Sequence, residues 1–218
     1  MTKIAVFRQP SKHPEYQIAG THWFNWSDES LLEKYLSLVQ AGAQTIIFVG
    51  NDIDAIKLVK AESSLPANQR LPVISHWGVT GGDFSGMAGN ILQEVNFSVV
   101  QTYSFIGKQD RGAKRVLAAL NRLYGVSDER RIESPVGVAH SYDLTHLLAK
   151  AINQAGSLDR NKIRQALEHL KTYQGLIKTY PRPFSPDHHD ALSIKDVFLA
   201  RYAPDGTIEP LPKKAKHH

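Results

Sequence analysis

The chain has 218 residues, enough to bury a substantial core in one domain or in two small lobes. Hydrophobic residues make up 42% and charged residues 22%, as in globular proteins, and no apolar run approaches the ~18 residues of a membrane span. Cysteine is absent, which excludes disulfides, thiolate nucleophiles and cysteine-ligated zinc.

The net charge of +5 does not indicate a nucleic-acid partner. Three of the surplus positive charges are lysines in the tail at residues 212–218, so the body of the chain is nearly balanced. The other basic cluster lies on a predicted helix whose apolar residues recur at helical spacing, which favours a solvated face. This cluster comprises Lys108, Arg111, Lys114, Arg115 and Arg122.

The amino-terminal stretch MTKIAVFRQP contains an apolar run of only four residues, shorter than the ~7 to 15 residues of a secretory signal core. The sequence as written therefore predicts a cytoplasmic protein, unless an export segment has been lost or removed, so the compartment stays open at this point. Residues 3–7 predict a strand, and residues 16–26 predict a second, irregular strand with aromatic residues at its end.

The next segments alternate between helical and strand patterns. Residues 27–29 predict the start of a helix of about four turns that ends at Gly42. Residues 45–49, TIIFV, predict a strand covered on both faces, and residues 71–75, LPVIS, predict another after a helix at 51–63. This alternation predicts an α/β fold with a doubly wound parallel sheet.

The second half of the chain predicts mainly helices. A strand at residues 96–105 leads into helices at residues 110–124, 135–155 and 159–170. Gly125 and Gly156 close the first two helices, while Ser134 and Asp159 precede the last two as caps. The end of the chain predicts a strand, a Pro-rich loop and a hairpin that turns at residues 203–206.

Polar and aromatic residues follow two of the predicted strands. They are Asn51 and Asp52 after the first strand, and Ser75, His76, Trp77 and Gly78 after the second. Because ligands of open parallel sheets bind beyond the carboxyl ends of the strands, these residues predict a small-molecule site. Asp52 would accept from an N–H group and Trp77 would form a flat apolar wall. The pattern equally allows Trp77 to close the sheet and Asp52 to cap the next helix.

Two other groups of residues are candidates for phosphate binding and for metal binding, but neither has the pattern that such a site needs. Residues 78–82, GVTGG, lack both the glycine order of a dinucleotide loop and the Lys-Ser/Thr pair of a P-loop. His140, Asp143 and His146 lie on one predicted helix, but a separation of six residues turns the two histidines apart by ~120°. Capping, packing or hydrogen bonding is the preferred interpretation of these three residues, and no metal site is predicted.

Two further groups suggest catalysis without supporting it. His188 and His189 lie in a proline-flanked loop and are interpreted as polar surface. Asp83 and His76 would need a nucleophilic serine, yet no G-x-S-x-G turn exposes one. The sequence therefore predicts no catalytic residue and no cofactor.

Several segments together resemble the type I periplasmic solute-binding proteins of the branched-chain amino acid, amide and urea group, the receptors of ABC importers. They are WFNWSDESLLEKYLSLVQAGAQTIIFVGN, LPVISHWGVTGGDF, SYDLTHLLAKAINQAGSLDRNKIRQALE and DVFLARYAPDGTIEPL, in the order of the family. The resemblance covers most of residues 21–211. It implies two α/β lobes, a ligand held in the cleft between them, an ABC permease as partner, no catalysis and a periplasmic location.

By this comparison, residues 1–105 with 192–211 would form one nearly complete α/β lobe. Residues 106–191 would form a partial, mainly helical second lobe, followed by the basic tail. The strand ends at residues 49–52 and 75–78 match cleft-lining positions of the family. Its amino-acid binders place an acid close to the position of Trp77 to hold the ligand's ammonium, and the absence of that acid argues against an ordinary α-amino acid.

The sequence also departs from the family. It is expected to begin where the family's second lobe begins and so to lack the strands that open the first lobe, which would leave helices with an uncovered apolar face. Two hypotheses follow. One is a shortened solute-binding protein or ligand sensor for an amino-acid-like or amide-like molecule, and the other is a non-binding scaffold that forms a homodimer or docks on a partner through exposed helices.

Overall fold

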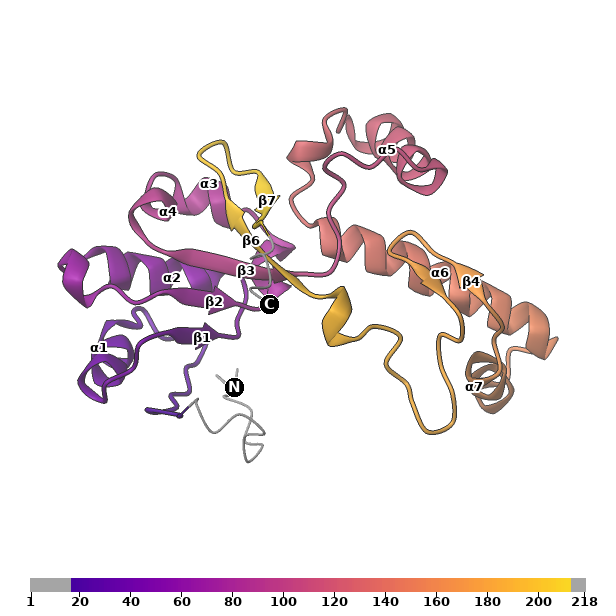
Figure 1. Ribbon diagram of the computed structural model, residues 1–218, viewed down its shortest axis with the longest axis horizontal. Coiled ribbons are helices and arrows are strands. Elements are labelled where there is room, and N and C mark those ends of the chain that lie inside the picture. Colours follow the sequence, from indigo (N-terminus) through magenta and orange to yellow (C-terminus); the bar gives the residue numbers. More distant parts are fainter. Residues whose placement is uncertain (1–16, 213–218) are drawn as a thin grey trace, which may run out of the picture. The chain divides into compact units, whose positions relative to one another are not determined.

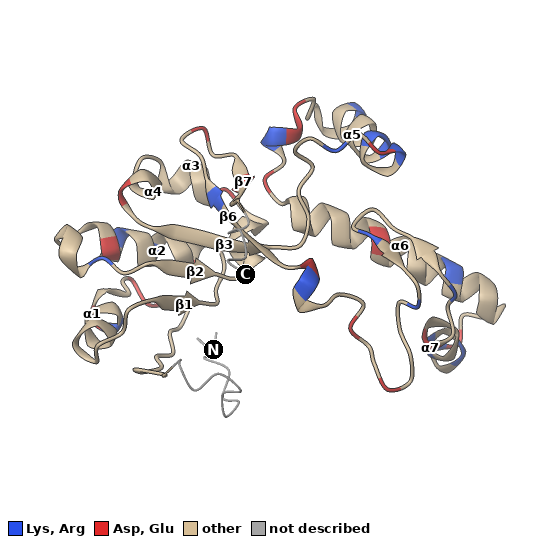
Figure 2. Ribbon diagram, viewed as in Figure 1, with Lys and Arg blue, Asp and Glu red and all other residues tan. Residues whose placement is uncertain are grey.

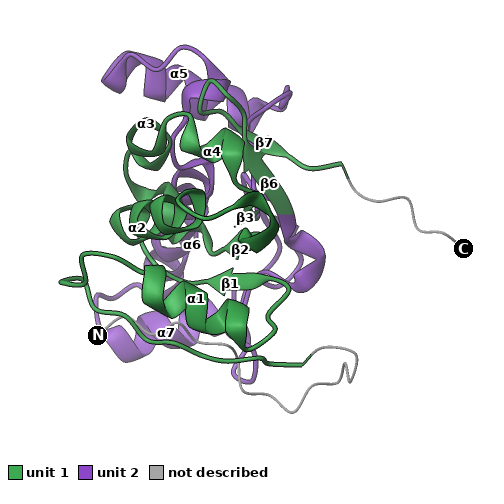
Figure 3. Cartoon of the chain, turned by 90° about the vertical axis from the view of Figure 1, so that its left-hand side faces the viewer, with its two compact units in different colours: residues 1–101, 199–218 green, residues 102–198 purple. Residues whose placement is uncertain are grey.

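The structure, a computed structural model, describes residues 17–212 of the chain (Figure 1). The described residues form two compact units, unit 1 with residues 17–101 and 199–212, and unit 2 with residues 102–198 (Figure 3). The division into two lobes that was predicted from the sequence stays a prediction. The predicted strand at residues 3–7 and nearly all of the basic tail lie outside the described residues.

Unit 1 is built on a five-stranded sheet with the order β1-β2-β3-β6-β7. The strands β1 (Ile46–Phe48), β2 (Val73–Ser75) and β3 (Phe97–Gln101) are parallel. The strands β6 (Phe198–Tyr202) and β7 (Ile208–Pro210) form the predicted antiparallel hairpin. A mixed α/β fold with a mainly parallel sheet was predicted, and the structure confirms it.

Helices connect the strands of unit 1. They are α1 (Leu32–Gln40), α2 (Asp52–Ser63), α3 (Phe84–Ala88) and α4 (Ile91–Glu94), with short 3-10 turns η1 (Ala67–Gln69) and η2 (Trp77–Gly81). Helix α2 packs against α1, α3 and α4 (Figure 1). Phe84 packs against Phe97 and Tyr202, with ring centroids 5.1 and 5.3 Å away, so aromatic contacts join α3 to β3 and β6.

Three expectations for unit 1 are wrong. No strand forms in residues 17–26, because Phe24 is buried while Trp26 is 71% exposed and no continuous buried face results. Helix α1 begins at Leu32, because the Asp28 carboxylate accepts from the backbone N–H of Asn25 and so stabilises a turn there. Ile47 is 46% exposed, so β1 is covered on one face only among the described residues.

Unit 2 contains three main helices and a small hairpin. Its elements are α5 (Arg111–Tyr124), η3 (Glu129–Arg131), α6 (Pro135–Ala155), α7 (Arg160–Glu168), β4 (Tyr173–Gln174), β5 (Thr179–Tyr180) and η4 (Ile194–Asp196). The predicted glycine ends of α5 and α6 and the predicted Asp159 cap of α7 are confirmed, whereas Ser134 precedes α6 without a side-chain capping bond and α7 ends at Glu168 instead of residue 170. Gly125 and Gly156 follow α5 and α6 with φ of +72° and +55°, and the Asp159 carboxylate accepts from the N–H of Lys162 at 3.0 Å.

Helix α6 carries both hydrophobic clusters of unit 2. Ala139 packs with Tyr103, Phe105 and residues of α5, while Leu147 and Ala151 pack with α7 and the β4–β5 hairpin. No helix among the described residues combines the length and apolar character needed to cross a membrane.

Candidate functional site

The parallel register brings the carboxyl ends of three strands to one edge of the unit 1 sheet. Phe48 of β1 pairs with Ser75 of β2, which pairs with Val99 of β3. Because side chains in the same row of a parallel sheet lie on the same face, the residues just beyond this row are neighbours. The sequence-predicted residues after β1 and β2 are therefore at the same edge.

His76 occupies the centre of this edge. Its backbone N–H donates to the carbonyl oxygen of Phe48 at 2.9 Å, which continues the β1–β2 pairing by one bond. Its ring Nδ1 accepts from the backbone N–H of Gly78 at 3.0 Å, so the imidazole caps η2. Burial lowers the pKa of His76, which keeps the ring neutral at neutral pH.

The residues on either side of His76 are held to it. The Ser75 hydroxyl is fully buried and donates to the carbonyl oxygen of His76 at 3.0 Å. The indole of Trp77 is half-buried and lies against the imidazole, with ring centroids 4.3 Å apart and planes inclined by 37°. These contacts fix one flat aromatic group and one neutral imidazole at the strand end.

Two glycines allow close approaches at this edge. A Cβ at Gly78 would lie 2.8 Å from the carbonyl oxygen of Gly50, so the two strand ends approach through bare backbone. A Cβ at Gly82 would lie 2.1 Å from Oδ2 of Asp52, so the carboxylate of Asp52 lies directly over the backbone at the end of η2. A larger residue at Gly78 would push the two strand ends apart, and one at Gly82 would displace the Asp52 carboxylate.

Asn51 and Asp52 begin α2. Asn51 is exposed and its side chain makes no capping hydrogen bond, although its carbonyl oxygen accepts from the N–H of Ala55 at 2.9 Å. The structure therefore does not support the alternative that the Asp52 side chain is the helix cap, since Asn51 holds the cap position. The amide of Asn51 and the carboxylate of Asp52 extend the polar edge beside β1.

One residue of this edge was missed from the sequence. Gln101 ends β3 and is 1% exposed; its Nε2 donates to the carbonyl oxygen of Val100, whereas its Oε1 has no hydrogen-bond partner among the described residues. The sequence contained a signal for Gln101, because it lies at the carboxyl end of a third parallel strand, at the same edge as the ends of the other two. The mainly apolar strand run around Gln101 concealed it.

The histidine groups rejected from the sequence have structural partners in unit 2. Asp143 accepts from the N–H groups of Leu176 and Ile177 at 2.5 and 3.0 Å and from the Tyr180 hydroxyl at 2.9 Å. His140 Nε2 lies 2.8 Å from Thr102 Oγ1, and burial lowers the pKa of His140 although the Asp143 charge acts in the opposite direction. Asp143 thus stabilises the β4–β5 hairpin.

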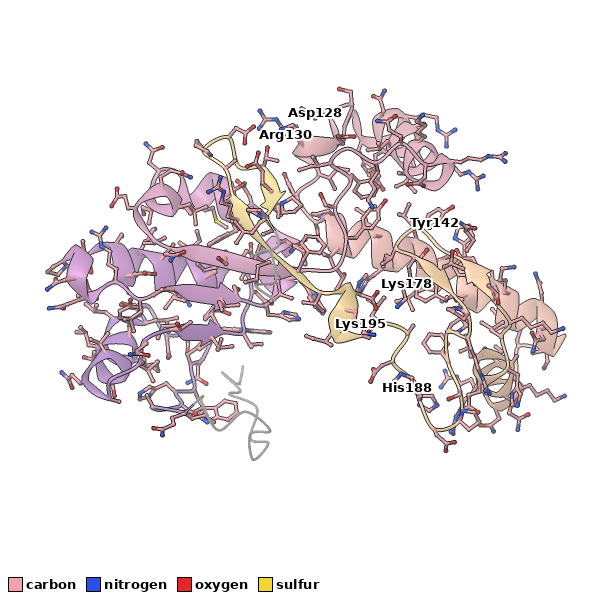
Figure 4. All side chains as sticks on the ribbon, viewed as in Figure 1. Asp128, Arg130, Tyr142, Lys178, His188 and Lys195 are labelled. Atoms are coloured by element: carbon pink, nitrogen blue, oxygen red, sulfur yellow. The ribbon has the colours of Figure 1, made fainter. Side chains whose placement is uncertain are left out.

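The remaining histidines follow the same pattern. His146 Nδ1 lies 2.9 Å from the carbonyl oxygen of Tyr142, a residue of α6 labelled in Figure 4. His188 lies on the loop after β5 (Figure 4). His189 Nε2 is 3.2 Å from Oε1 of Glu168. In the part of the chain that the structure describes, no group of three or more His, Asp or Glu side chains is arranged to hold a metal ion.

Unit 1 also contains a small cavity. It has a volume of about 20 Å³ and is bordered by side chains of α1, β1 and α2 together with His22. This volume holds about one water molecule, so the cavity is too small for an organic ligand.

Solved structures resemble the chain over most of its length. A type 1 periplasmic binding protein from Bordetella pertussis has a TM-score of 0.70 and 21% identity over 87% of this chain and 51% of its own. The leucine-binding protein LivK from Thermotoga maritima has a TM-score of 0.67 and 16% identity over 87% of this chain and 49% of its own. The chain has the fold of the type I periplasmic binding proteins.

A third structure with this periplasmic-binding-protein fold is a solute-binding protein of an ABC transporter from Rhodopseudomonas palustris, in complex with p-hydroxybenzoic acid. Its TM-score is 0.60, with 19% identity over 84% of this chain and 48% of its own. The chain thus spans about half the length of these structures. No protein-family model and no curated protein matches the sequence.

Proposed function

We propose that the chain binds a small polar solute, without converting it, at the edge of unit 1 formed by the ends of β1 and β2. The observation that carries the proposal is the placement of a neutral imidazole, an indole and a carboxylate at adjoining strand ends that approach through glycine. Asn51, Asp52, His76, Trp77 and Gly78 are the proposed contacts. Ser75 supports the backbone of His76 from within.

The fold supports a role in uptake. One structure with this fold is described as periplasmic, and another as the solute-binding protein of an ABC transporter. By analogy, we propose that the chain delivers its solute to an ABC permease outside the cytoplasm. We favour an amide-like or amino-acid-like solute. The flat wall of Trp77 and the Asp52 carboxylate suit a planar group that carries N–H donors.

Thermal unfolding against a panel of solutes tests the proposal. The panel contains amino acids, short amides, urea, benzamide, benzoate and benzylamine. A solute that binds only the folded chain raises its stability by RT ln(1 + [L]/Kd), about 2.7 kcal/mol at a hundredfold excess over Kd. We expect a concentration-dependent rise in Tm that Trp77→Ala abolishes.

Trp26→Ala is the matched control, because Trp26 is also in unit 1 but is 71% exposed in the turn before α1. The control should keep the full ligand response. A flat panel with a cooperative transition would overturn solute binding at this edge, and a response that survives Trp77→Ala would move the site elsewhere.

A separate observation favours a second candidate function, a self-associating scaffold. Helix α6 has an apolar stripe at helical spacing on which Leu144 and Leu148 are 55% and 45% exposed, next to exposed Gly137 and Ser141. Figure 2 shows α6 largely without charge, whereas α5 and α7 carry several basic residues. Along α6 a second copy of the chain would meet one exposed charge, that of Lys150, whereas along α5 or α7 it would meet several like charges.

Sedimentation velocity over a range of protein concentrations tests this candidate. We expect a dimer that Leu148→Lys converts to a monomer, because a charge would be buried in the α6 contact. Ile194→Lys is the control, since Ile194 is 83% exposed in unit 2 but lies on η4. A monomer at every concentration, or equal dissociation by both variants, would rule out pairing through α6.

A further inference from the structure

The hydrogen bond between Gly78 and His76 determines which nitrogen of the imidazole carries the proton. A backbone N–H group can only donate, so Nδ1 of His76 must offer a lone pair to the N–H of Gly78, 3.0 Å away. A neutral imidazole has one N–H and one acceptor nitrogen. The proton of neutral His76 is therefore on Nε2.

Several contacts hold this arrangement in place. The backbone N–H of His76 is bonded to Phe48, its carbonyl oxygen accepts from Ser75, and its ring lies against Trp77. Protonation would place a hydrogen on Nδ1, the second N–H of the ring, and remove the acceptor for Gly78. Burial lowers the pKa of His76 and so opposes protonation.

Nε2 is the remaining polar atom of the ring. It makes no hydrogen bond to any residue that the structure describes. It is also not one of the fully buried polar atoms, so a solute can reach it. The half-buried imidazole therefore keeps one N–H donor available at the strand-end edge.

We infer that His76 acts as a donor-only contact and selects solutes that present a carbonyl-type oxygen to its Nε2–H. This inference rests on the proposed solute site and defines the chemistry of its ligand. A carboxamide supplies both an oxygen for the Nε2–H of His76 and N–H donors for the Asp52 carboxylate, whereas an ammonium group placed at Nε2 would face another donor and leave both unpaired. His76 thereby discriminates between solutes that share a hydrocarbon part and differ in the polar group.

The tautomer itself can be measured without a ligand. Two-bond ¹⁵N–¹H correlation spectra of the full chain at pH 8 distinguish the Nε2–H from the Nδ1–H form, and His76→Asn identifies the signals of His76 by their loss. We expect the Nε2–H pattern. An Nδ1–H pattern for His76 would overturn the inference, whatever the ligand panel shows.

Three probes with the same ring test the ligand chemistry: benzamide, benzoate and benzylamine. We expect benzamide to raise Tm most, because it offers an acceptor to His76 and N–H donors to Asp52, whereas benzoate offers only the acceptor and benzylamine only the donors. His76→Asn keeps an oxygen that can accept from Gly78 but removes the ring donor. It should weaken binding roughly fivefold to tenfold, the value of one hydrogen bond, and the Tm of the free variant measures separately the loss of the ring contact with Trp77.

The outcomes separate this inference from the proposed function. Stabilisation by benzylamine but not by the other two would overturn the donor-only role of His76 and leave solute binding intact. Unchanged affinity in His76→Asn would also overturn it. No response to any solute of the full panel would overturn the proposed binding function, and the ligand chemistry assigned to His76 with it.

Discussion

Glu62 of α2 is a buried carboxyl group in unit 1 without a hydrogen bond. It is 0% exposed, and neither carboxyl oxygen has a partner among the described residues. Burial raises the pKa of Glu62 to about 7, although the charge of Arg70 acts in the opposite direction. Arg70 cannot satisfy the carboxylate, since its guanidinium donates to the carbonyl oxygens of Ser63, Leu65 and Glu94.

Glu62 should make the stability of the chain depend on pH. Its pKa is higher in the folded state than the ordinary value of 4.5, so the folded state binds more protons between these two pH values. Its contribution is fully present below pH 4.5 and is lost as the pH rises through 7, which amounts to at most about 3 kcal/mol.

Urea unfolding at a series of pH values measures this loss. Glu62→Gln should remove the fall in the free energy of unfolding between pH 4.5 and 7, because the amide stays neutral. Glu33→Gln, on the exposed side of α1, is the control and should leave the fall in the free energy of unfolding unchanged. An identical pH slope in Glu62→Gln and the unmodified chain would refute the assignment.

Asp143 should be a major source of stability in unit 2. Asp143→Ala leaves one buried backbone N–H group, one half-buried N–H group and one buried tyrosine hydroxyl unpaired, so we expect a loss of about 3 kcal/mol. Tyr180→Phe removes one of these bonds and should cost about 1 kcal/mol. Amide hydrogen exchange at Leu176 and Ile177 would localise the effect, and unchanged protection in Asp143→Ala would contradict it.

At the scale of the element, the β4–β5 hairpin depends on the absence of a side chain at Gly175. A Cβ there would lie 2.6 Å from both Oδ2 of Asp143 and the ring of Tyr180. Gly175→Ala should therefore destabilise the hairpin by about 1 to 3 kcal/mol. Gly81→Ala is the control, since a Cβ at Gly81 meets nothing within 4 Å, and equal effects of the two variants on Tm would contradict this account.

The sequence predicted the elements whose signals are local. Helix α6 has proline at its first position and glycine after its end, and β2 is a short apolar run, so both were expected at the right places. Helices α3 and α4 are too short to show a helical period and were not predicted. The expected strand at residues 17–26 failed because its aromatic residues do not pack on a common face.

The candidate site was predictable only as a location. Parallel strands bring their carboxyl ends together, so Asn51 and His76 were expected at one edge. The capping bond from Gly78 to His76 and the position of Asp52 over Gly82 depend on side-chain geometry, which no spacing in the sequence specifies.

At the scale of the whole molecule, unit 1 is made from two distant segments of the chain. Strand β6 lies between β3 and β7, and Ala200, Tyr202 and Ile208 are buried. Deletion of residues 199–218 should therefore remove core side chains and leave β3 at the edge of the sheet. We expect loss of a cooperative thermal transition for unit 1, and a chain that keeps the original Tm after this deletion would contradict the two-segment core.

The late position of β6 has a consequence for synthesis on the ribosome. Every residue of unit 2 must be translated between β3 and β6, which at about 5 to 20 residues per second takes roughly 5 to 20 seconds. During that delay the nascent β3 exposes unpaired N–H and C=O groups that can bind strands of other chains. The yield of correctly folded protein should therefore depend on translation speed and on chaperones that shield this strand.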